Sequence, residues 1–347
     1  MADTFKFRID HHGSLVRPPE LLAARRQRAE NGMTADELRA VEDKAIAETV
    51  RAQRRLSLSV VTDGEFRRED FRGVVFDAVH GFRRTGGEVD GLARWVAAEE
   101  LKPHRALAAD DVAAVAAQTR IPAKATLPSP AYLAAQCFDP GAAGTPWRTA
   151  RELGEALARI IHDEITLLIA RGVRYIQLDN PGYAGWLFGA GASTLTLADA
   201  IAVDSLAVRL DGKPDDVRIG LCPTRHIAAT VDLAAAERIF AEVPVDRWML
   251  PYSTGAEAEQ RLLRAVPADR DACLGIVDPA AAELTDVSVI MDRMDAAAAV
   301  KDIEDVAVSP SAGFAEVAGR AGPGSEGQWR TMVHVETIAW MCWGNEL

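Results

Sequence analysis

Short apolar segments alternate with longer segments of helical spacing along most of this chain, and this order constrains the fold more than any other feature. Short runs rich in branched aliphatic residues indicate strands, whereas apolar residues three or four apart indicate helices. Strands are expected at residues 7–11, 58–61, 123–127, 174–178, 217–221, 247–250, 272–277 and 306–308. Helices are expected at residues 18–28, from 34 onward, and at 148–171, 197–210, 233–242, 256–265, 287–298 and 328–341.

Strands separated by helices pair in parallel, and repeated right-handed crossovers close such a sheet into a barrel. The eight expected strands predict an α/β fold, a (β/α)8 TIM barrel, formed as a single domain over residues 1–347. An excursion at residues 73–99 interrupts the pattern and is expected to be a hairpin over the barrel mouth. A doubly wound open sheet is the alternative, but its usual glycine-rich phosphate-binding turn is absent from the sequence.

The composition excludes several classes of partner. The net charge of −12 opposes binding to nucleic acid or to an anionic membrane surface. The four scattered cysteines fit a reducing compartment, and neither a signal sequence nor a long apolar run is present, so a cytoplasmic location is expected. The expected partner is a small-molecule substrate, and a homo-oligomer is left open.

Residues directly after each barrel strand converge on one mouth, where the active sites of such barrels lie. In this chain those positions are rich in polar side chains, namely His11, His12, Ser14, Asp63, Glu65, Asp179, Asn180, Cys222, Arg225, His226, Tyr252, Ser253, Asp278, Ser309 and Ser311. Adjacent strand residues point to opposite faces, so at most one of His11 and His12 is expected to face the mouth. We expect the active site at this mouth.

Three carboxylates stand out in this set. Asp63 and Glu65 would lie on one side of an extended chain, about 7 Å apart, where they could bind an ammonium group or share a proton. The alternative is that Asp63 caps the turn and Glu65 pairs with Arg67 or Arg68. Asp179 follows an apolar strand, and a carboxylate there must be hydrogen-bonded or paired. A functional role for Asp179 is favoured over a capping role.

Cys222 and His226 are four residues apart, directly after a strand. On a helical turn they would face the same way and could share a metal ion or form a thiolate–imidazolium pair. Pro223 lies between them and leaves this geometry open. A core position for the cysteine is the alternative.

Several strand-end motifs resemble the cobalamin-independent methionine synthase family, in particular its short bacterial members that correspond to the catalytic C-terminal barrel alone. The motifs are residues 10–18 (DHHGSLVRP), 34–38 (TADEL), 60–68 (VVTDGEFRR), 176–181 (IQLDNP) and 309–314 (SPSAGF). The resemblance implies a TIM barrel that transfers a methyl group from a methylated folate to the thiol of homocysteine held on zinc. It also implies that the Gly13–Ser14 turn and Glu65 bind the amino-acid substrate and that Asp179 contacts it.

The positions that hold zinc in that family are mostly changed here. The resemblance implies a His and a Cys two residues apart, then a Glu and a late Cys. Gly220 stands at the His position, Pro251 at or near the Glu position and Ala312 at the late Cys position. A zinc site needs three or four protein ligands. No metal is therefore expected, and Cys222 is the only retained ligand position.

The candidate site residues fall into two groups. The candidate catalytic residues are Asp179, His226, Cys222 and Glu65. The candidate substrate-binding residues are His11, Ser14, Arg17, Asp63, Asn180, Arg225 and Tyr252. Asn180 replaces the Glu that follows this Asp in the family.

The expected function is a diverged methyl- or alkyltransferase that resembles 5-methyltetrahydropteroyltriglutamate-homocysteine S-methyltransferase, with methylated folate as the candidate co-substrate. His226 as a base or Arg225 as a charge partner would activate the thiol. A metal-independent lyase or hydrolase of a small carbonyl or amino-acid-like substrate is an alternative. A non-catalytic small-molecule binding protein, or a metal held by new ligands such as His11, Asp63 and His226, also stays open.

Overall fold

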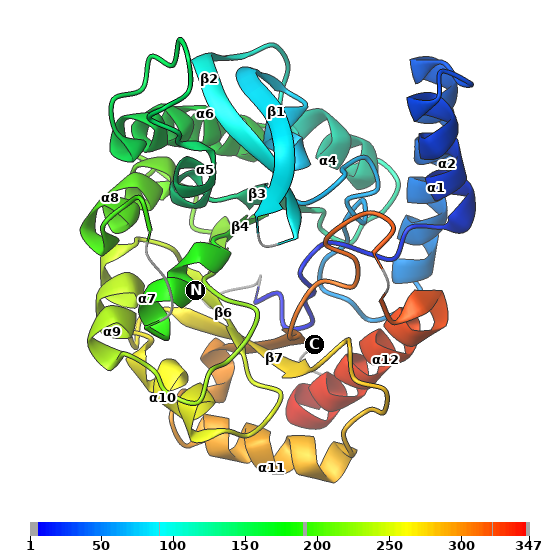
Figure 1. The fold of residues 1–347 in the computed structure, drawn as a ribbon. Coiled ribbons are helices and arrows are strands. Elements are labelled where there is room, and N and C mark those ends of the chain that lie inside the picture. The colour runs from blue at the N-terminus through cyan, green and yellow to red at the C-terminus, as the bar shows by residue number, and fades with distance from the viewer. Residues whose placement is uncertain (1–5, 90, 190–192, 321, 345–347) are drawn as a thin grey trace.

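The computed structural model describes residues 6–89, 91–189, 193–320 and 322–344 (Figure 1). The strands are β1 (Val79–Val89), β2 (Leu92–Pro103), β3 (Lys124–Pro128), β4 (Tyr175–Asp179), β5 (Arg218–Cys222), β6 (Arg247–Pro251), β7 (Asp271–Val277) and β8 (Val306–Pro310). The helices are α1 (Pro19–Ala29), α2 (Ala35–Gln53), α3 (Gly73–Phe76), α4 (Ala109–Ala116), α5 (Pro130–Cys137), α6 (Ala150–Ala170), α7 (Ala184–Leu187), α8 (Leu197–Val208), α9 (Leu233–Glu242), α10 (Glu257–Ala265), α11 (Val287–Ala298) and α12 (Gly324–Trp343). Short 3-10 turns lie at Pro181–Tyr183 and Ile303–Asp305.

Two short N-terminal segments complete the ring that the parallel sheet begins. Strands β3 to β8 are hydrogen-bonded in chain order, all parallel. Ile9 makes a parallel bridge to Val308 of β8, and Val61 makes one to Ala123, next to β3. The Ser59 N–H donates to the Ile9 carbonyl at 3.0 Å, which joins the two segments. The fold is the expected TIM barrel, with helices around the outside (Figure 1).

The two N-terminal strands are shorter than expected. Residues 7–11 and 58–61 each contribute a single bridge and no regular strand. The chain turns away directly after each bridge, where Gly13 has φ +115° and Gly64 has φ +69°. Such values favour glycine, which has no Cβ. Strands β3 to β8, in contrast, begin and end within two residues of the expected positions.

A buried charged group holds the first segment inside the barrel. Every residue of β3, β4, β6 and β8 is buried, as is typical of parallel strands covered on both faces. Within this apolar interior the Lys124 Nζ lies 2.7 Å from Asp10 Oδ1. The Tyr175 hydroxyl donates to Asp10 Oδ2 at 2.7 Å. These contacts join the first segment to β3 and β4.

The excursion before β3 is a short helix followed by a long hairpin. β1 and β2 pair antiparallel from Val79 opposite Pro103 to Val89 opposite Leu92. The hairpin was expected within residues 73–99, so it begins later and ends later than the sequence suggested. Leu92 packs with Phe71, which brings the hairpin to the rim of the cavity described below.

The structure also contains elements that the sequence did not indicate. Helices α4 and α5 flank β3, where no helix was expected, and both are short and rich in alanine. Within the ranges that the structure describes, none of the helices combines the length and apolar character needed to cross a membrane.

Candidate active site at the barrel mouth

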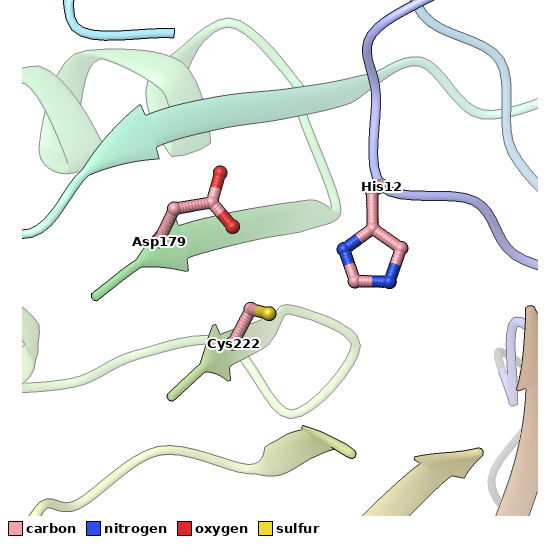
Figure 2. Close-up of side chains that lie close together, drawn as sticks. All are labelled: His12, Asp179 and Cys222. Carbon is pink, nitrogen blue, oxygen red and sulfur yellow. The ribbon is translucent and has the colours of Figure 1, made fainter. Parts of the chain in front are cut away.

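Three buried side chains meet where two adjacent strands end. β4 ends at Asp179 and β5 at Cys222, and these two residues are partners in the parallel register. His12 belongs to the loop after the first short segment, and its ring faces the other two side chains (Figure 2). The candidate ligand atoms of the three residues lie within 4.8 Å of one another. Such a group could hold a metal ion or exchange a proton.

Gln177 sets the position of the carboxylate relative to the first loop. Its Nε2 donates to Asp179 Oδ1 at 2.8 Å and to the carbonyl oxygen of His12 at 3.2 Å. Gln177 lies two residues before Asp179 on β4, so the two side chains share one face of the strand. One amide therefore joins two members of the cluster.

Burial changes the proton affinity of all three groups. It raises the pKa of Asp179 to about 6, although the charge of Arg225 opposes this. It raises the pKa of the Cys222 thiol to about 12, and Asp179 adds to the effect. It lowers the pKa of His12 to about 3, with a further contribution from Arg225. Near neutral pH the cluster without a metal is therefore a thiol, a neutral imidazole and a carboxylate.

Arg225 connects this cluster with a neighbouring cavity. Its Nη2 lies 3.8 Å from Asp179 Oδ2, and its Nη1 forms an ion pair with Glu316. Its guanidinium also lies over the Phe71 ring, 4.8 Å from the centroid. Burial opposes the charge, but Glu316 and Asp179 raise the pKa of Arg225 above its ordinary value. Arg225 therefore supplies a fixed positive charge at the mouth.

A cavity of about 420 Å³ lies beside Arg225. Its walls include Phe71, Tyr132, Phe188, Thr224, His226 and Glu316. The volume falls within the range of small-molecule sites, which are mostly apolar with a few polar groups. Aromatic rings next to a fixed cation suit a flat ligand that carries negative charge.

Glu65 presents a free carboxylate oxygen in this mouth. Its Oε1 accepts the Thr126 hydroxyl at 2.8 Å, and its Oε2 has no partner among the described residues. The Glu65 N–H donates to Asp63 Oδ1 at 2.8 Å, and Arg68 lies 3.4 Å from Glu65 Oε1. Both structural alternatives, the Asp63 turn cap and the Glu65–Arg68 pair, are therefore formed, yet one buried oxygen stays free.

The backbone of Glu65 has a φ of +60°. A residue with a side chain adopts this left-handed conformation only at a cost, and such residues are concentrated at functional sites. Besides burial, the Glu65 carboxylate adds to the raised pKa of Asp179. The two carboxylates therefore lie in the same mouth.

Ser14 and Arg17 join the first loop to its neighbours. The Phe314 N–H donates to the Ser14 carbonyl at 3.1 Å, and the Ser14 hydroxyl packs against Gly313. The Arg17 Nη2 donates to the carbonyl oxygen of Glu65 at 2.8 Å. Both residues, expected to bind substrate, thus hold the loops that carry other site residues.

Three further predicted residues are engaged with protein groups. The His11 Nδ1 accepts a backbone N–H two residues later at 3.3 Å. The Asn180 amide donates to Asp204 Oδ2 at 2.8 Å. The Tyr252 hydroxyl donates to the carbonyl oxygen of Arg293 at 3.4 Å, which directs it toward α11. The structure does not bring these three side chains into the cluster of Figure 2.

His226 lies apart from Cys222, contrary to the expected pairing. The residues after β5 do not form a helical turn. Instead, Cys222 Sγ donates to the Thr224 carbonyl at 3.3 Å, and the Thr224 hydroxyl donates to the His226 carbonyl at 2.7 Å. His226 is exposed and lines the cavity. The imidazole beside Cys222 is that of His12.

Three residues of this site, Phe71, Gln177 and Glu316, were not singled out from the sequence, and His12 was expected near the mouth but was not among the candidate site residues. Strand alternation could have identified Gln177, because it lies two positions before Asp179. The loops that carry Phe71 and Glu316 have no periodic pattern that places them.

Three of the four zinc-ligand positions implied by the resemblance carry residues without a ligand atom. Gly220 has no side chain, and a Cβ there would lie 3.2 Å from the Tyr175 ring. Pro251 and Ala312 offer no ligand atom. In the part of the chain that the structure describes, the three side chains of Figure 2 are the group that converges closely enough to bind a metal ion.

Comparison with known proteins places this chain in a family. The model of the family described as "Cobalamin-independent synthase, Catalytic domain" matches residues 12–335. YxjH and YxjG of Bacillus subtilis (strain 168) are 27% and 29% identical to this chain, and each alignment covers 97% of this chain and 95% of the relative.

Solved structures support the barrel fold. A candidate vitamin-B12-independent methionine synthase from Listeria monocytogenes has a TM-score of 0.78 at 23% identity, with 97% of this chain and 98% of that chain covered. A B12-independent methionine synthase from Shewanella sp. W3-18-1, solved in complex with selenomethionine, has a TM-score of 0.74 at 15% identity. The match covers 96% of this chain and 97% of that chain. Because the family model spans most of the sequence, this protein belongs to the cobalamin-independent synthase catalytic-domain family.

Proposed function

We propose that this protein transfers a methyl or other alkyl group from a methylated folate to the thiol of a small amino-acid-like acceptor. Membership of a methyltransferase-type family supports this class of reaction. The observation that carries the proposal is that two buried carboxylates, Glu65 and Asp179, share a mouth with a cavity of about 420 Å³. Three of the four zinc-ligand positions implied by the resemblance carry no ligand atom, so the proposed reaction would activate the thiol in another way.

The free oxygen of Glu65 supports an acceptor with an amino group. A buried carboxylate oxygen without a partner is costly, and an ammonium group would satisfy it. Glu65 Oε2 is such an atom, on a side chain held by Thr126. The proposed acceptor is therefore an amino-thiol, with homocysteine as the first candidate.

The cavity supports a flat donor with acidic groups. Phe71, Tyr132 and Phe188 provide aromatic surface, and Arg225 and Arg320 provide positive charge. A methylated folate has a planar ring and a carboxylate tail that match this lining. We propose that the donor occupies this cavity next to the acceptor.

In the proposed transfer the sulfur forms a bond to the methyl carbon, and the bond between that carbon and the donor nitrogen breaks. The electron pair stays on the nitrogen, which takes up a proton, and the thiol proton leaves. His226, on the cavity wall, would accept the thiol proton. Arg225 would stabilise the thiolate through its charge.

The test is a transfer assay on the full chain. Methylated tetrahydrofolates with short and long glutamate tails are incubated with homocysteine and other amino-thiols, and mass spectrometry detects the methylated thiol. We expect product, and we expect Glu65→Gln to raise the KM for the thiol by roughly tenfold or more, because a hydrogen bond to a charged group contributes about 1.5–3 kcal/mol. The exposed Glu48→Gln serves as the matched control.

Other outcomes would reject the proposal. A product formed from a metabolite extract without methyl transfer, and lost in Asp179→Asn, would indicate a lyase or hydrolase. A compound that raises the melting temperature and is recovered unchanged would indicate a binding protein.

A further inference from the structure

We propose that His12, Asp179 and Cys222 form a binding site for a transition-metal ion of the zinc class, through a ligand set that differs from that of the family. The proposal deepens the proposed function, and the use of this ion to activate a thiol rests on that function. The site itself rests on the geometry of the cluster and on the unpaired nitrogen of His12.

The donor set fits a zinc-class ion. An imidazole nitrogen from the first loop, and a carboxylate oxygen and a thiol sulfur from the ends of β4 and β5, converge within 4.8 Å. Catalytic zinc sites have three such protein ligands and one open position. Bonds of about 2.0–2.3 Å would place tetrahedral ligand atoms about 3.3–3.8 Å apart, so small side-chain rotations close the site. Mixed nitrogen, oxygen and sulfur ligands do not favour calcium or magnesium, which take oxygen.

His12 provides a second, independent observation. Its side chain is buried, with 7% of the residue exposed, and its Nδ1 has no hydrogen-bond partner among the described residues. Figure 2 shows the ring with this nitrogen on the side of Asp179 and Cys222. An unpaired buried acceptor is costly, and an ion between the three side chains would satisfy it.

The surroundings support the three ligands. Gln177 donates to Asp179 Oδ1 at 2.8 Å and so fixes the position of the carboxylate, while Oδ2 stays available to an ion. Partners of this kind orient metal ligands and strengthen binding. Arg225 lies 3.8 Å from Asp179 Oδ2 and would compete with an ion. Its ion pair with Glu316 gives the guanidinium another partner when the carboxylate turns to the metal.

The proposed ligand set keeps Cys222, one of the ligand positions implied by the resemblance, and takes its other ligands from different positions. Gly220 and Cys222 lie on the same face of β5, but the Tyr175 ring occupies the space next to Gly220. Pro251, at the end of β6, has no ligand atom. The ion would therefore lie toward β4 and the first loop, where Asp179 and His12 are.

A zinc-class ion keeps a thiol that binds it deprotonated near neutral pH. Arg225 lies between the cluster and the cavity, so an acceptor thiol that reaches the cluster would be close to a donor in the cavity. Glu65 would hold the amino group of the same acceptor.

The test measures metal binding directly. The full chain is purified without an affinity tag, stripped with a chelator, and titrated with Zn²⁺ and with Co²⁺. We expect about one ion per chain and, with Co²⁺, a thiolate-to-metal charge-transfer band. Each of His12→Ala, Asp179→Asn and Cys222→Ser should lower the affinity at least about tenfold, and Cys222→Ser should remove the band.

Two control variants separate this site from others. Cys137→Ser removes another buried thiol, and His226→Ala removes the exposed histidine of the cavity. Both should bind metal like the natural protein. Circular dichroism establishes that each variant is folded, and the cobalt band of the natural protein reports the thiolate ligand even if Cys222→Ser fails to fold.

The outcomes distinguish the metal site from the proposed function. No tight binding of Zn²⁺ or Co²⁺ by the natural protein would overturn the metal site, as would binding lost in His226→Ala but kept in His12→Ala. Methyl transfer unaffected by metal removal would also overturn its catalytic role while leaving the proposed function intact. Metal binding that depends on the three residues, without any methyl transfer, would support the site and reject the function.

Discussion

Lys124 and Asp10 form an ion pair inside the barrel, with Nζ and Oδ1 2.7 Å apart and neither side chain exposed to solvent. Lys124 also donates to the carbonyl oxygen of His11 at 2.8 Å. The pair thus joins β3 to the segment directly before His12. The pair therefore holds in place the loop that carries His12, whose position the local sequence pattern does not predict.

Replacement of Lys124 by methionine should destabilise the protein strongly. The Asp10 carboxylate would stay buried without its counter-charge, and breaking one side of a buried ion pair costs about 3–5 kcal/mol. Urea unfolding measures the loss. Lys102→Met is the control, because Lys102 is exposed and its pair with Glu100 lies at the surface, where pairs contribute about 0–1 kcal/mol. Equal unfolding midpoints for the two variants would contradict the prediction.

Glu164 of α6 should be important for stability. Its carboxylate accepts the backbone N–H groups of Leu107, Ala108 and Ala109 at 2.8, 2.8 and 2.7 Å, at the start of α4. A Glu164→Gln amide has only one accepting oxygen, so a buried N–H loses its partner at a cost of about 1–3 kcal/mol.

The matched control for Glu164 lies on the same helix. Glu155 of α6 is paired with Arg151 at 3.0 Å at the surface, and Glu155→Gln should change the free energy of unfolding by less than about 0.5 kcal/mol. Chemical denaturation of both variants decides the comparison. If Glu164→Gln is no less stable than Glu155→Gln, the capping role is wrong.

Gly313 and Ser14 should show strong coupling. A Cβ on Gly313 would overlap the Ser14 hydroxyl oxygen, so Gly313→Ala should cost about 1–3 kcal/mol through overpacking. Removal of the hydroxyl in Ser14→Gly should make the same alanine much better tolerated. A double-mutant cycle measures the coupling, and additive effects would show that the overlap is relieved in another way.

Asp204 should make the stability depend on pH. It is 0% exposed and accepts the Ser129 hydroxyl at 2.6 Å and the Asn180 amide at 2.8 Å. Burial raises the pKa of Asp204 above its ordinary value, and these hydrogen bonds offset only part of the effect. The folded state therefore binds the proton more tightly than the unfolded state, and stability falls as the pH rises through and above the ordinary pKa of about 4.

Asp204→Asn, which does not titrate, isolates this effect. The free energy of unfolding of the natural protein relative to the variant should decrease as the pH rises from acid toward neutral. Urea titrations at a series of pH values give this difference. A difference that stays constant with pH would contradict the raised pKa.

The regular part of the barrel could be predicted because its strands are buried on both faces. Such strands are continuous apolar runs followed by polar turns, and β3 to β8 follow that pattern. The two N-terminal segments could not be predicted in the same way. Each pairs through a single bridge, and the contact that holds the first segment joins Asp10 to Lys124, far along the chain.

In the candidate site, too, the residues at strand ends could be predicted and the loop residue could not. Asp179 and Cys222 could be placed at the mouth because each ends an apolar strand. His12 could not be distinguished from His11, because alternation limits the pair to one inward side chain without saying which one. The expected turn from Cys222 to His226 depended on a helical geometry that the Thr224 contacts replace. The local sequence pattern does not say in which direction a side chain in a loop points.

The bridge between Ile9 and Val308 joins the two ends of the chain, so it bears on the order in which the candidate site assembles during synthesis. Asp179 and Cys222 come side by side as soon as β4 and β5 pair, in a chain that is still growing on the ribosome. The segment that carries His12 can contact β3 and β4 through Asp10 at that stage, but its pairing with β8 forms only after the last strand has been made. A growing chain would therefore hold His12 from one side of the ring alone, and release of the full-length chain would close the second side.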